Sequence, residues 1–330
     1  MGSVKDLEVI KKPTEGALGV GRFLFSDRYS VFDWGEMPDH IPYKGEAIAL
    51  LGAFFFEELE ARGIPTHYLG LVQDGQAKKL SDIERPVNAM EIKMVRVLGS
   101  DYFRYQRERG GFLIPLEVIY RNSLPAGSSV FRRLEGGELK PEDLALDAGG
   151  ILNPGQRLSP PFIDFSTKLE ATDRYLGSEE AREIAGLSDG EMAEMRRITD
   201  EVNTIITEKF SRIGLVNEDG KMEFGFTPHR RFMVVDVVGT LDECRFTFGG
   251  LPVSKEIARI HYRKTDWYLE LGKAKEKGEN WREFCPPPPP SLPEKLKFAI
   301  SEVYCACTNE ITGRRWFDVP PLGEVLGELK

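Results

Sequence analysis

The sequence has no long apolar run and no excess of positive charge, and both absences exclude classes of protein. No apolar stretch reaches the roughly 20 residues that a membrane-spanning helix needs. The N-terminal MGSVKDLEVIKKP carries charges where a signal peptide has a long apolar region. We therefore expect a cytoplasmic protein without a membrane partner. The net charge of −9 disfavours nucleic acid as a partner, because binding its phosphates needs a broad basic face.

Cysteine is scarce, and its spacing excludes a disulfide framework. The four residues, Cys244, Cys285, Cys305 and Cys307, follow neither a framework pattern nor the paired CxxC spacing of a zinc site. Cys305 and Cys307 alternate along a stretch that we expect to be a strand, so a metal site is one interpretation. Free thiols in a reducing compartment are the interpretation that we favour, because the four histidines are scattered elsewhere.

Common catalytic signatures are also missing. The GxxxxGK[ST] phosphate loop, the HExxH metal helix and the GxSxG nucleophile turn do not occur. The histidines form no arrangement typical of a Ser-His or Cys-His relay; they are His40, His67, His229 and His261. We therefore expect chemistry that relies on phosphate activation and a metal ion, not on a histidine base.

What is present is the composition of an ordinary globular chain. Its 330 residues are 41% hydrophobic and 29% charged, enough for two domains or one large α/β or α+β unit. The apolar periods and turn residues predict paired strands over 21–35, a helix over 45–63, a strand over 89–99 and a helix from Ser188 to about Ile213. A polyproline run at 286–290 is predicted to be a stiff spacer before a C-terminal segment. We expect that segment to serve packing or a subunit contact.

The stretch PLEVIYRNSLPAGSS, residues 115–129, combines a strand with a loop rich in hydroxyl groups. Alternation places Leu116, Val118 and Tyr120 on one face and Glu117, Ile119 and Arg121 on the other. The loop that follows offers serine hydroxyls and free backbone N–H groups. One interpretation is an anion site beside a cation-handling acid. The other is a cross-strand salt bridge on a solvated face.

The stretch KMEFGFTPHRRFMVVDVVG, residues 221–239, is predicted to be a hairpin that gathers three charges. If TPHR is a four-residue turn, Phe226 opposes Arg231, Lys221 opposes Asp236 and Glu223 opposes Val234. Lys221, Glu223 and Asp236 then project from one side, while Met222, Phe224 and Val235 pack into the core. Two carboxylates and an ammonium suit Mg²⁺ with a phosphate-bearing substrate. A solvated face with one weak ion pair is the alternative.

Several blocks occur in the order found in one enzyme family. They are GSVKDLEV, SDRYSVFD, IPYKGEA, GIPTHYLG, PLEVIYRN, AGSS, the segment from Lys168 to Asp173, DGKMEFGF and DECRF. Over residues 2–265 the chain resembles the SAICAR synthetases (phosphoribosylaminoimidazole-succinocarboxamide synthases), and most of all their longer archaeal forms. The resemblance implies an ATP-dependent ligase of purine biosynthesis. Such an enzyme phosphorylates the carboxylate of carboxyaminoimidazole ribonucleotide (CAIR), and the amino group of L-aspartate then displaces phosphate from the acyl phosphate.

The resemblance also implies a fold. It is an α+β fold with two lobes, a β-rich N-terminal lobe and a larger mixed α/β C-terminal lobe, and the active site lies between them. The corresponding division is an ATP-binding lobe over 1–98, a connecting hinge over 99–114, a substrate- and metal-binding lobe over 115–284, and the spacer and C-terminal appendage over 285–330. A homo-oligomer is compatible with this arrangement, and the partners implied are small molecules only.

Residue roles follow from the same resemblance. The residues implied to hold Mg²⁺ are Glu223 and Asp236. Those implied to contact ATP are Lys5, Lys168 and Glu117. The catalytic set is Lys221, Asp173 and Glu117. The substrate-binding set is Arg121, Ser128, Asp173, Lys221, Arg245 and Arg263.

Two departures from the family pattern keep other functions open. Ser3 stands where the glycine loop usually has a lysine, and Val237 stands where a second acid often follows the metal-binding aspartate. A ligase or kinase with a different substrate on the same scaffold, or a nucleotide-binding regulatory protein, therefore remains an alternative. The acids, lysines and arginine named above weigh against a regulatory protein, because such a protein has no need for a metal pair beside an anion clamp.

Overall fold

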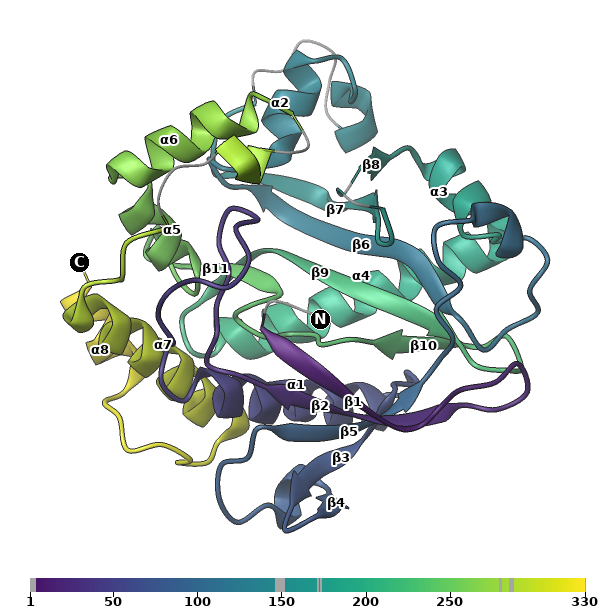
Figure 1. Ribbon diagram of the computed structural model, residues 1–330, viewed down its shortest axis with the longest axis horizontal. Coiled ribbons are helices and arrows are strands. Elements are labelled where there is room, and N and C mark those ends of the chain that lie inside the picture. Colours follow the sequence, from purple (N-terminus) through teal and green to yellow (C-terminus); the bar gives the residue numbers. More distant parts are fainter. Residues whose placement is uncertain are drawn as a thin grey trace.

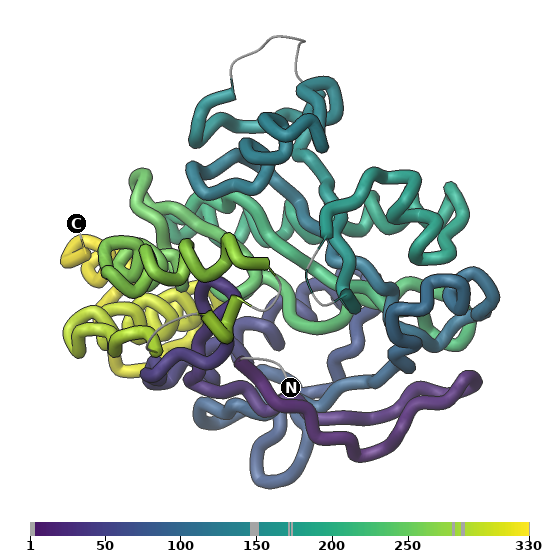
Figure 2. Tube along the Cα trace, turned by 45° about the horizontal axis from the view of Figure 1, so that its top comes forward, coloured from purple at the N-terminus to yellow at the C-terminus, as the bar shows by residue number. Residues whose placement is uncertain are grey.

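The computed structural model describes residues 4–145, 152–170, 172, 174–278, 281–284 and 288–329. Two β-sheets form its centre, and helices cover their outer faces (Figure 1). Figure 2 shows the N-terminal strands (purple) along one edge and the C-terminal helices (yellow) gathered on one flank. No helix in the described part of the chain is long and apolar enough to cross a bilayer.

The first sheet is antiparallel and is built from the N-terminal part of the chain. Its strand order is β1-β2-β5-β3-β4, and its strands are β1 (Lys5–Lys11), β2 (Gly19–Phe25), β3 (Tyr68–Gln73), β4 (Gln76–Lys78) and β5 (Ala89–Met94). The predicted strand over 89–99 is therefore confirmed in its first half. The predicted second strand of 21–35 is wrong. Phe32 and Asp33 adopt positive φ values, so the chain turns there instead of extending.

Helix α1 (Lys44–Ala61) packs against the first sheet, and it confirms the helix predicted over 45–63. Its apolar residues recur with the helical period, so Ile48, Leu51, Phe55 and Leu59 are all buried. Gly63 follows with φ +81°, a left-handed conformation that lets the chain leave the helix toward β3.

The second sheet has seven strands in the order β12-β11-β9-β6-β7-β8, with β10 paired to β9. Its strands are β6 (Leu113–Leu124), β7 (Gln156–Thr167), β8 (Tyr175–Leu176), β9 (Val216–Phe226), β10 (Phe232–Val235), β11 (Cys244–Phe248) and β12 (Leu251–Pro252). Helix α4 (Asp189–Ser211) packs on β6 and β9 and confirms the second predicted helix. Ser188 begins it through a capping box with Glu191.

The remaining helices are short except α7. They are α2 (Ser129–Glu135), α3 (Ser178–Ile184), α5 (Glu256–Tyr262), α6 (Asp266–Lys275), α7 (Glu294–Thr312) and α8 (Leu322–Glu328), with 3₁₀ turns η1 (Leu80–Asp82), η2 (Tyr102–Arg104), η3 (Pro141–Leu144) and η4 (Trp281–Phe284). Helix α7 packs against α1, so the segment after the polyproline run contributes to the main core.

The strand expected around Cys305 and Cys307 is wrong, because both residues lie on helix α7. The stretch is apolar on one helical face, where Ile300, Val303 and Tyr304 are also buried against α1. Cys244, Cys305 and Cys307 are buried free thiols, which agrees with the favoured interpretation. Cys285 lies outside the described residues.

The two sheets meet at a short junction between the chain before β3 and strand β10. The backbone N–H of His67 donates to the oxygen of Val234 (3.0 Å), and the N–H of Val234 donates to the oxygen of Pro65 (2.9 Å). These bonds bring the end of β10 beside the first sheet, which decides where Asp236 lies.

Candidate active site

A cavity of about 670 Å³ lies between the two sheets and collects most of the predicted site residues. Its walls come from the start of β1, the segment after β2, the strands β6, β7, β9 and β11, and helix α5. Figure 1 shows the start of β1 (purple) near the end of β10. The predicted residues that line this cleft are Lys5, Glu117, Arg121, Lys168, Lys221, Asp236, Arg245 and Arg263.

Of the other three predicted residues, the structure describes two, and neither lines the cleft. Glu223 is buried directly behind it and reaches it through Lys168. The Oγ of Ser128 accepts from the backbone N–H of Val130 and caps α2, and its neighbour Ser129 lines the cleft instead. Asp173 lies outside the described residues.

The predicted alternation along β6 is confirmed. Leu116, Val118 and Tyr120 are fully buried in the core, whereas Glu117, Ile119 and Arg121 face the cleft. The face that carries the acid and the arginine is not solvated, since the side chains of Glu117 and Arg121 are only 9% and 2% exposed. A weak surface salt bridge therefore does not describe this strand.

The predicted register of the β9–β10 hairpin is wrong by one residue. Phe226 lies opposite Phe232 and Glu223 lies opposite Val235. Thr227 and Arg231 are joined by a backbone hydrogen bond, so the turn is the three-residue PHR and not TPHR. Arg230 adopts a left-handed conformation, a usual feature of three-residue hairpin turns. No glycine stands at that position to indicate such a turn.

Asp236 still reaches the site, by a route that the pattern could not show. Strand β10 ends at Val235, and Asp236 has φ +64°, so the chain leaves the ladder there and turns toward the first sheet. The Nζ of Lys5 lies 2.6 Å from Oδ1 of Asp236. Met222 and Phe224 are buried in the core as predicted, but Val235 shares the side of Glu223 and does not lie on their face.

Glu117 and Glu223 lie directly opposite each other on β6 and β9; Lys168 bridges them, and Lys221 contacts Glu117 alone of the two. The Nζ of Lys168 lies 3.2 Å from Oε1 of Glu117 and 2.6 Å from Oε1 of Glu223. The Nζ of Lys221 lies 2.8 Å from Oε1 of Glu117 and 3.7 Å from Glu243. Like charges on opposed cross-strand positions repel, so the lysines make this pairing tenable.

Burial raises the pKa of each acid in this cluster and the neighbouring lysines lower it, so the net shift differs from one acid to the next. Burial, together with the charge of Asp236, raises the pKa of Glu223. Burial also opposes ionisation of Asp236, but the adjacent Lys5 outweighs it and lowers the pKa of that carboxyl. The same balance holds at Glu117, where Lys221 and Lys168 overcome burial and lower the pKa. A second positive charge near Glu223 would therefore be favourable.

The other end of the cleft is built from arginines. Arg121 donates from Nη2 to Oδ2 of Asp164 (2.9 Å), and its Nη1 lies 3.7 Å from Oδ2 of Asp219. Arg245 donates from Nε to Oδ1 of the same Asp219 (2.8 Å). Arg263 lies farther out and pairs with Glu256 (2.8 Å). The cleft thus has an acid-and-lysine end and a guanidinium end.

Comparison with known proteins identifies the family. The SAICAR synthetase family profile matches residues 14–250. The chain is 52% identical to a protein of Archaeoglobus fulgidus that is provisionally named a phosphoribosylaminoimidazole-succinocarboxamide synthase, over 100% of this chain and 99% of that protein. The chain belongs to the SAICAR synthetase family.

Other members of the SAICAR synthetase family agree. The phosphoribosylaminoimidazole-succinocarboxamide synthase of Thermoplasma acidophilum is 32% identical over 89% of this chain and 93% of that protein. The fold is similar to that of the Saccharomyces cerevisiae SAICAR synthase complexed with SAICAR, with a TM-score of 0.67 at 21% identity over 96% of this chain and 95% of that one. A type-2 SAICAR synthetase in complex with ADP has a TM-score of 0.62 at 20% identity over 97% and 98% of the two chains.

These findings confirm three expectations drawn from the sequence blocks. They confirm the family, the two-lobed α+β fold of SAICAR synthetases, and the class of activity, an ATP-dependent ligase. The alternative of a regulatory protein without catalysis is not supported by relatives that carry the enzyme name along their full length.

Sequence reasoning missed several residues of the cleft. Lys255 is partly buried and donates from Nζ to the backbone oxygen of Asp242 (2.7 Å), and Arg259 pairs with Glu256 (3.0 Å). Both line the cleft. The pattern that could have predicted them is the four-residue spacing of Lys255, Arg259 and Arg263, which places three cations on one face of α5.

Proposed function

We propose that this chain joins L-aspartate to the carboxylate of CAIR with the hydrolysis of ATP, and that the cleft between the sheets is the site of the reaction. The products are SAICAR, ADP and phosphate. One observation carries the proposal: at one end of a single cleft three lysines pair with three acids, Glu117, Asp236 and the underlying Glu223, and at the other end lies a guanidinium cluster. Those two ends suit the phosphates of ATP and an anionic ribonucleotide.

The reaction needs activation of an unreactive carboxylate. An oxygen of that carboxylate attacks the γ-phosphorus of ATP, ADP leaves, and an acyl phosphate remains. The amino nitrogen of L-aspartate then attacks the acyl carbon and loses a proton, and phosphate leaves with the electrons of the C–O bond. Phosphoryl transfer depends mainly on positioning and on neutralised charge, so lysines and acids suffice where a histidine base is absent.

Glu223 and Asp236 fit a magnesium site. Mg²⁺ is commonly held by one or two carboxylates together with substrate phosphates and water. The raised pKa of Glu223 reflects the cost of keeping two carboxylates close together under burial, and a divalent cation would remove that cost. The described residues contain no cluster of three or more acidic, histidine or cysteine side chains with ligand spacing, so phosphates and water would complete the set. When bound, the ion would neutralise charge on the transferred phosphoryl group.

The lysines that contact the acids are assigned to phosphate and carboxylate groups of the substrates. Their acidic neighbours outweigh the effect of burial and raise the pKa of Lys5, Lys168 and Lys221, so all three stay charged. We assign Lys5 and Lys168 to ATP with Glu117 beside them. Lys221, Glu117 and Asp173 remain the proposed catalytic set.

The guanidinium end is assigned to the ribonucleotide. Arg121 is the central residue there, supported by Ser128 at the start of α2 and by Arg245. The hydroxyl of Ser128 already caps α2 and its backbone N–H donates to the oxygen of Pro125 (2.8 Å), so the neighbouring Ser129, which lines the cleft, is better suited to an anion. Arg263 is an outer contact, since Glu256 already pairs with it.

The proposal extends to the organisation of the chain. It keeps the ATP-binding lobe at 1–98, the hinge at 99–114, the substrate- and metal-binding lobe at 115–284 and the C-terminal segment at 285–330. We also propose a cytoplasmic location. The proposed partners are small molecules only, with neither nucleic acid nor a membrane among them, and a homo-oligomer is a compatible assembly.

Two isotope-labelling experiments test the proposal. With CAIR, ATP, Mg²⁺ and ¹⁵N-labelled L-aspartate, we expect a product that contains CAIR and aspartate less one water and that carries the label. With ¹⁸O in the carboxylate of CAIR, we expect one labelled oxygen in the released phosphate. ADP formation without a ligated product would indicate a kinase, and phosphate without ¹⁸O would exclude the acyl phosphate.

A further inference from the structure

A buried cluster of charges lies behind Arg121, on the side away from the cleft. Asp164 of β7 accepts from Arg121 Nη2 (2.9 Å) and from Arg133 Nη1 (2.6 Å) at the same oxygen, Oδ2. The other oxygen, Oδ1, accepts from the backbone N–H of Phe165 (3.2 Å). The side chains of Arg121, Asp164 and Arg133 are at most 4% exposed. One carboxylate is therefore shared by two buried guanidinium groups.

The charges of this cluster do not balance. Its ion pairs join three guanidinium groups and two carboxylates, which belong to Arg121, Arg133, Arg245, Asp164 and Asp219. The Nε of Arg133 is buried without a hydrogen-bond partner. Buried charge is costly unless it is paired, so this cluster favours one further anion. Of the two arginines that share Asp164, only Arg121 lines the cleft, so the anion is expected there.

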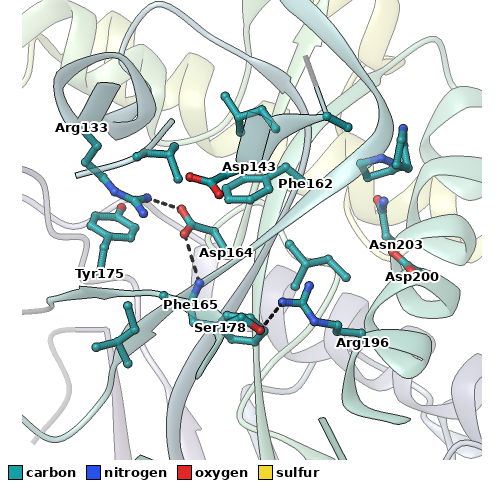
Figure 3. Close-up of a pocket in the computed structure, with 18 of the residues that line it drawn as sticks. Arg133, Asp143, Phe162, Asp164, Phe165, Tyr175, Ser178, Arg196, Asp200 and Asn203 are labelled. Carbon is teal, nitrogen blue, oxygen red and sulfur yellow. Dashed lines mark hydrogen bonds and ion pairs between the residues drawn. The ribbon is translucent and has the colours of Figure 1, made fainter. Parts of the chain in front are cut away.

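Arg133 lines a different cavity from the cleft. A second cavity of about 590 Å³ is lined by Arg133, Tyr175, Arg196 and Asp164 itself. Figure 3 shows these side chains around it. The guanidinium carbon of Arg133 lies 4.1 Å from the ring centroid of Tyr175, which also lines the cleft. Arg133 thus acts on the cleft only through Asp164 and Tyr175.

Sharing Asp164 changes what Arg121 offers to a ligand. A guanidinium paired with its own carboxylate is nearly neutral toward a third group. Because Arg133 takes part of the same carboxylate, Arg121 keeps a net attraction for an anion while Asp164 fixes its orientation. Helix α2 contributes to both the charge and the orientation of Arg121. It carries Arg133, and the Oγ of its Ser129 accepts from Arg121 Nη2 (3.4 Å).

We propose that Arg133 and Asp164 are positioning residues that hold Arg121 oriented and leave its positive charge only partly compensated, so that it binds the phosphate of the ribonucleotide. The inference rests on the proposed function for the identity of that anion. Neither residue is expected to touch the substrate.

The test compares the effect of Arg133 on the three substrates. In Arg133→Met we expect the KM for CAIR to rise about tenfold, the value that corresponds to one lost charge–charge interaction of moderate strength. The KM values for ATP and L-aspartate should stay within about twofold, because charges on those substrates bind elsewhere. Arg133→Lys keeps the charge and should restore most of the affinity for CAIR. A purely structural role would change all three KM values or none.

Arg196→Met is the matched control. Arg196 lines the same second cavity, and its Nη2 donates to Ser178 Oγ (2.9 Å) (Figure 3). Among the described residues it takes no part in the ion pairs that join Arg121, Asp164 and Arg133. It should leave the KM for CAIR unchanged. An equal rise in Arg196→Met, or an unchanged KM for CAIR in Arg133→Met, would overturn the proposal. If Arg133→Met does not fold, Arg133→Gln, which keeps a polar contact without the charge, is decided by the same criterion.

Calorimetric titration with ribose 5-phosphate separates this inference from the proposed function. If the wild-type enzyme binds the probe and Arg133→Met binds it about tenfold more weakly, the positioning role holds even where CAIR is not turned over. If turnover of CAIR is normal and the variant binds the probe as wild type does, the proposed function holds and the inference fails. Absence of both turnover and probe binding in the wild type would overturn both.

Discussion

The Nε2 of His67 lies 2.9 Å from the backbone oxygen of Asp236 and donates a hydrogen bond to it. His67 belongs to the first sheet's side of the junction, and its ring packs against Phe23 and Phe56. Asp236 is the residue with the left-handed backbone at the end of β10. A residue of the N-terminal lobe therefore fixes the conformation of an acid that the C-terminal lobe contributes to the proposed metal site.

The first prediction concerns this hydrogen bond. His67→Leu removes the donor and frees the strained backbone of Asp236 to relax, so the Mg²⁺ concentration for half-maximal rate should rise roughly five- to tenfold. His67→Gln retains an N–H donor and should stay closer to wild type. The control is Thr66→Val, which removes an equally buried hydroxyl that donates to Glu60 and does not contact Asp236. An unchanged Mg²⁺ requirement in His67→Leu would contradict this role.

A second prediction follows from the burial of the same ring. Burial lowers the pKa of His67 to about 4, below the ordinary value of 6.5. Between those pH values the unfolded chain binds a proton that the folded chain does not, so stability must fall as pH decreases from 6.5 toward 4. The loss amounts to roughly 3 kcal/mol. Urea denaturation of the Mg²⁺-free protein across this range should show a steeper loss for wild type than for His67→Gln. Parallel curves would show that the imidazole titrates alike in both states.

The third prediction concerns Asp236 itself. In Asp236→Asn the proposed metal site loses a charged ligand and Lys5 loses its partner at 2.6 Å. Turnover should fall by roughly 100-fold or more, while the far-ultraviolet circular dichroism and the folded state persist. Excess Mg²⁺ should recover part of the rate. Turnover like that of wild type would remove Asp236 from the metal site.

The fourth prediction concerns an ion pair that joins three parts of the chain. Lys44 at the start of α1 is fully buried and lies 2.7 Å from Asp242, which also accepts from the hydroxyl of Tyr304 on α7 (2.6 Å). Burial opposes the charge of Asp242, yet Lys44 and Lys255 outweigh it and lower its pKa. Lys44→Met leaves this carboxylate poorly compensated and should cost roughly 3–5 kcal/mol of unfolding free energy.

Chemical denaturation measures that cost, and a double variant gives the control. Lys44→Met with Asp242→Asn removes both charges and should recover a large part of the loss. Equal stability of Lys44→Met and wild type would mean that Lys255 and Tyr304 alone satisfy Asp242.

Sequence patterns correctly predicted those helices and strands whose hydrophobic period depends only on their own residues. Helices α1 and α4 and the two faces of β6 could be predicted because their own residues determine which side is buried. The family blocks then supplied the order of the site residues along the chain. The stretch around Cys305 shows the limit of this reasoning, since a short apolar segment fits a strand and a helix equally well until its neighbour α1 is known.

What could not be predicted depends on contacts between distant segments. The hairpin register changed by one residue because Arg230 adopts a left-handed conformation without being a glycine. Asp236 reaches Lys5 through a backbone turn held by His67, 169 positions away in the chain. Arg133 and Asp164 bear on Arg121 only once α2 and β7 pack against β6. None of these contacts leaves a periodic signal in the sequence.

The central claim is that one cleft uses ATP to join two substrates, and phosphate release tests it most directly. Purified protein with ATP and Mg²⁺ would be assayed with CAIR and L-aspartate together and with each omitted in turn. We expect sustained phosphate release that requires both substrates and that is lost in Asp236→Asn. Sustained release without CAIR, or none with all substrates present while ATP binds, would contradict it.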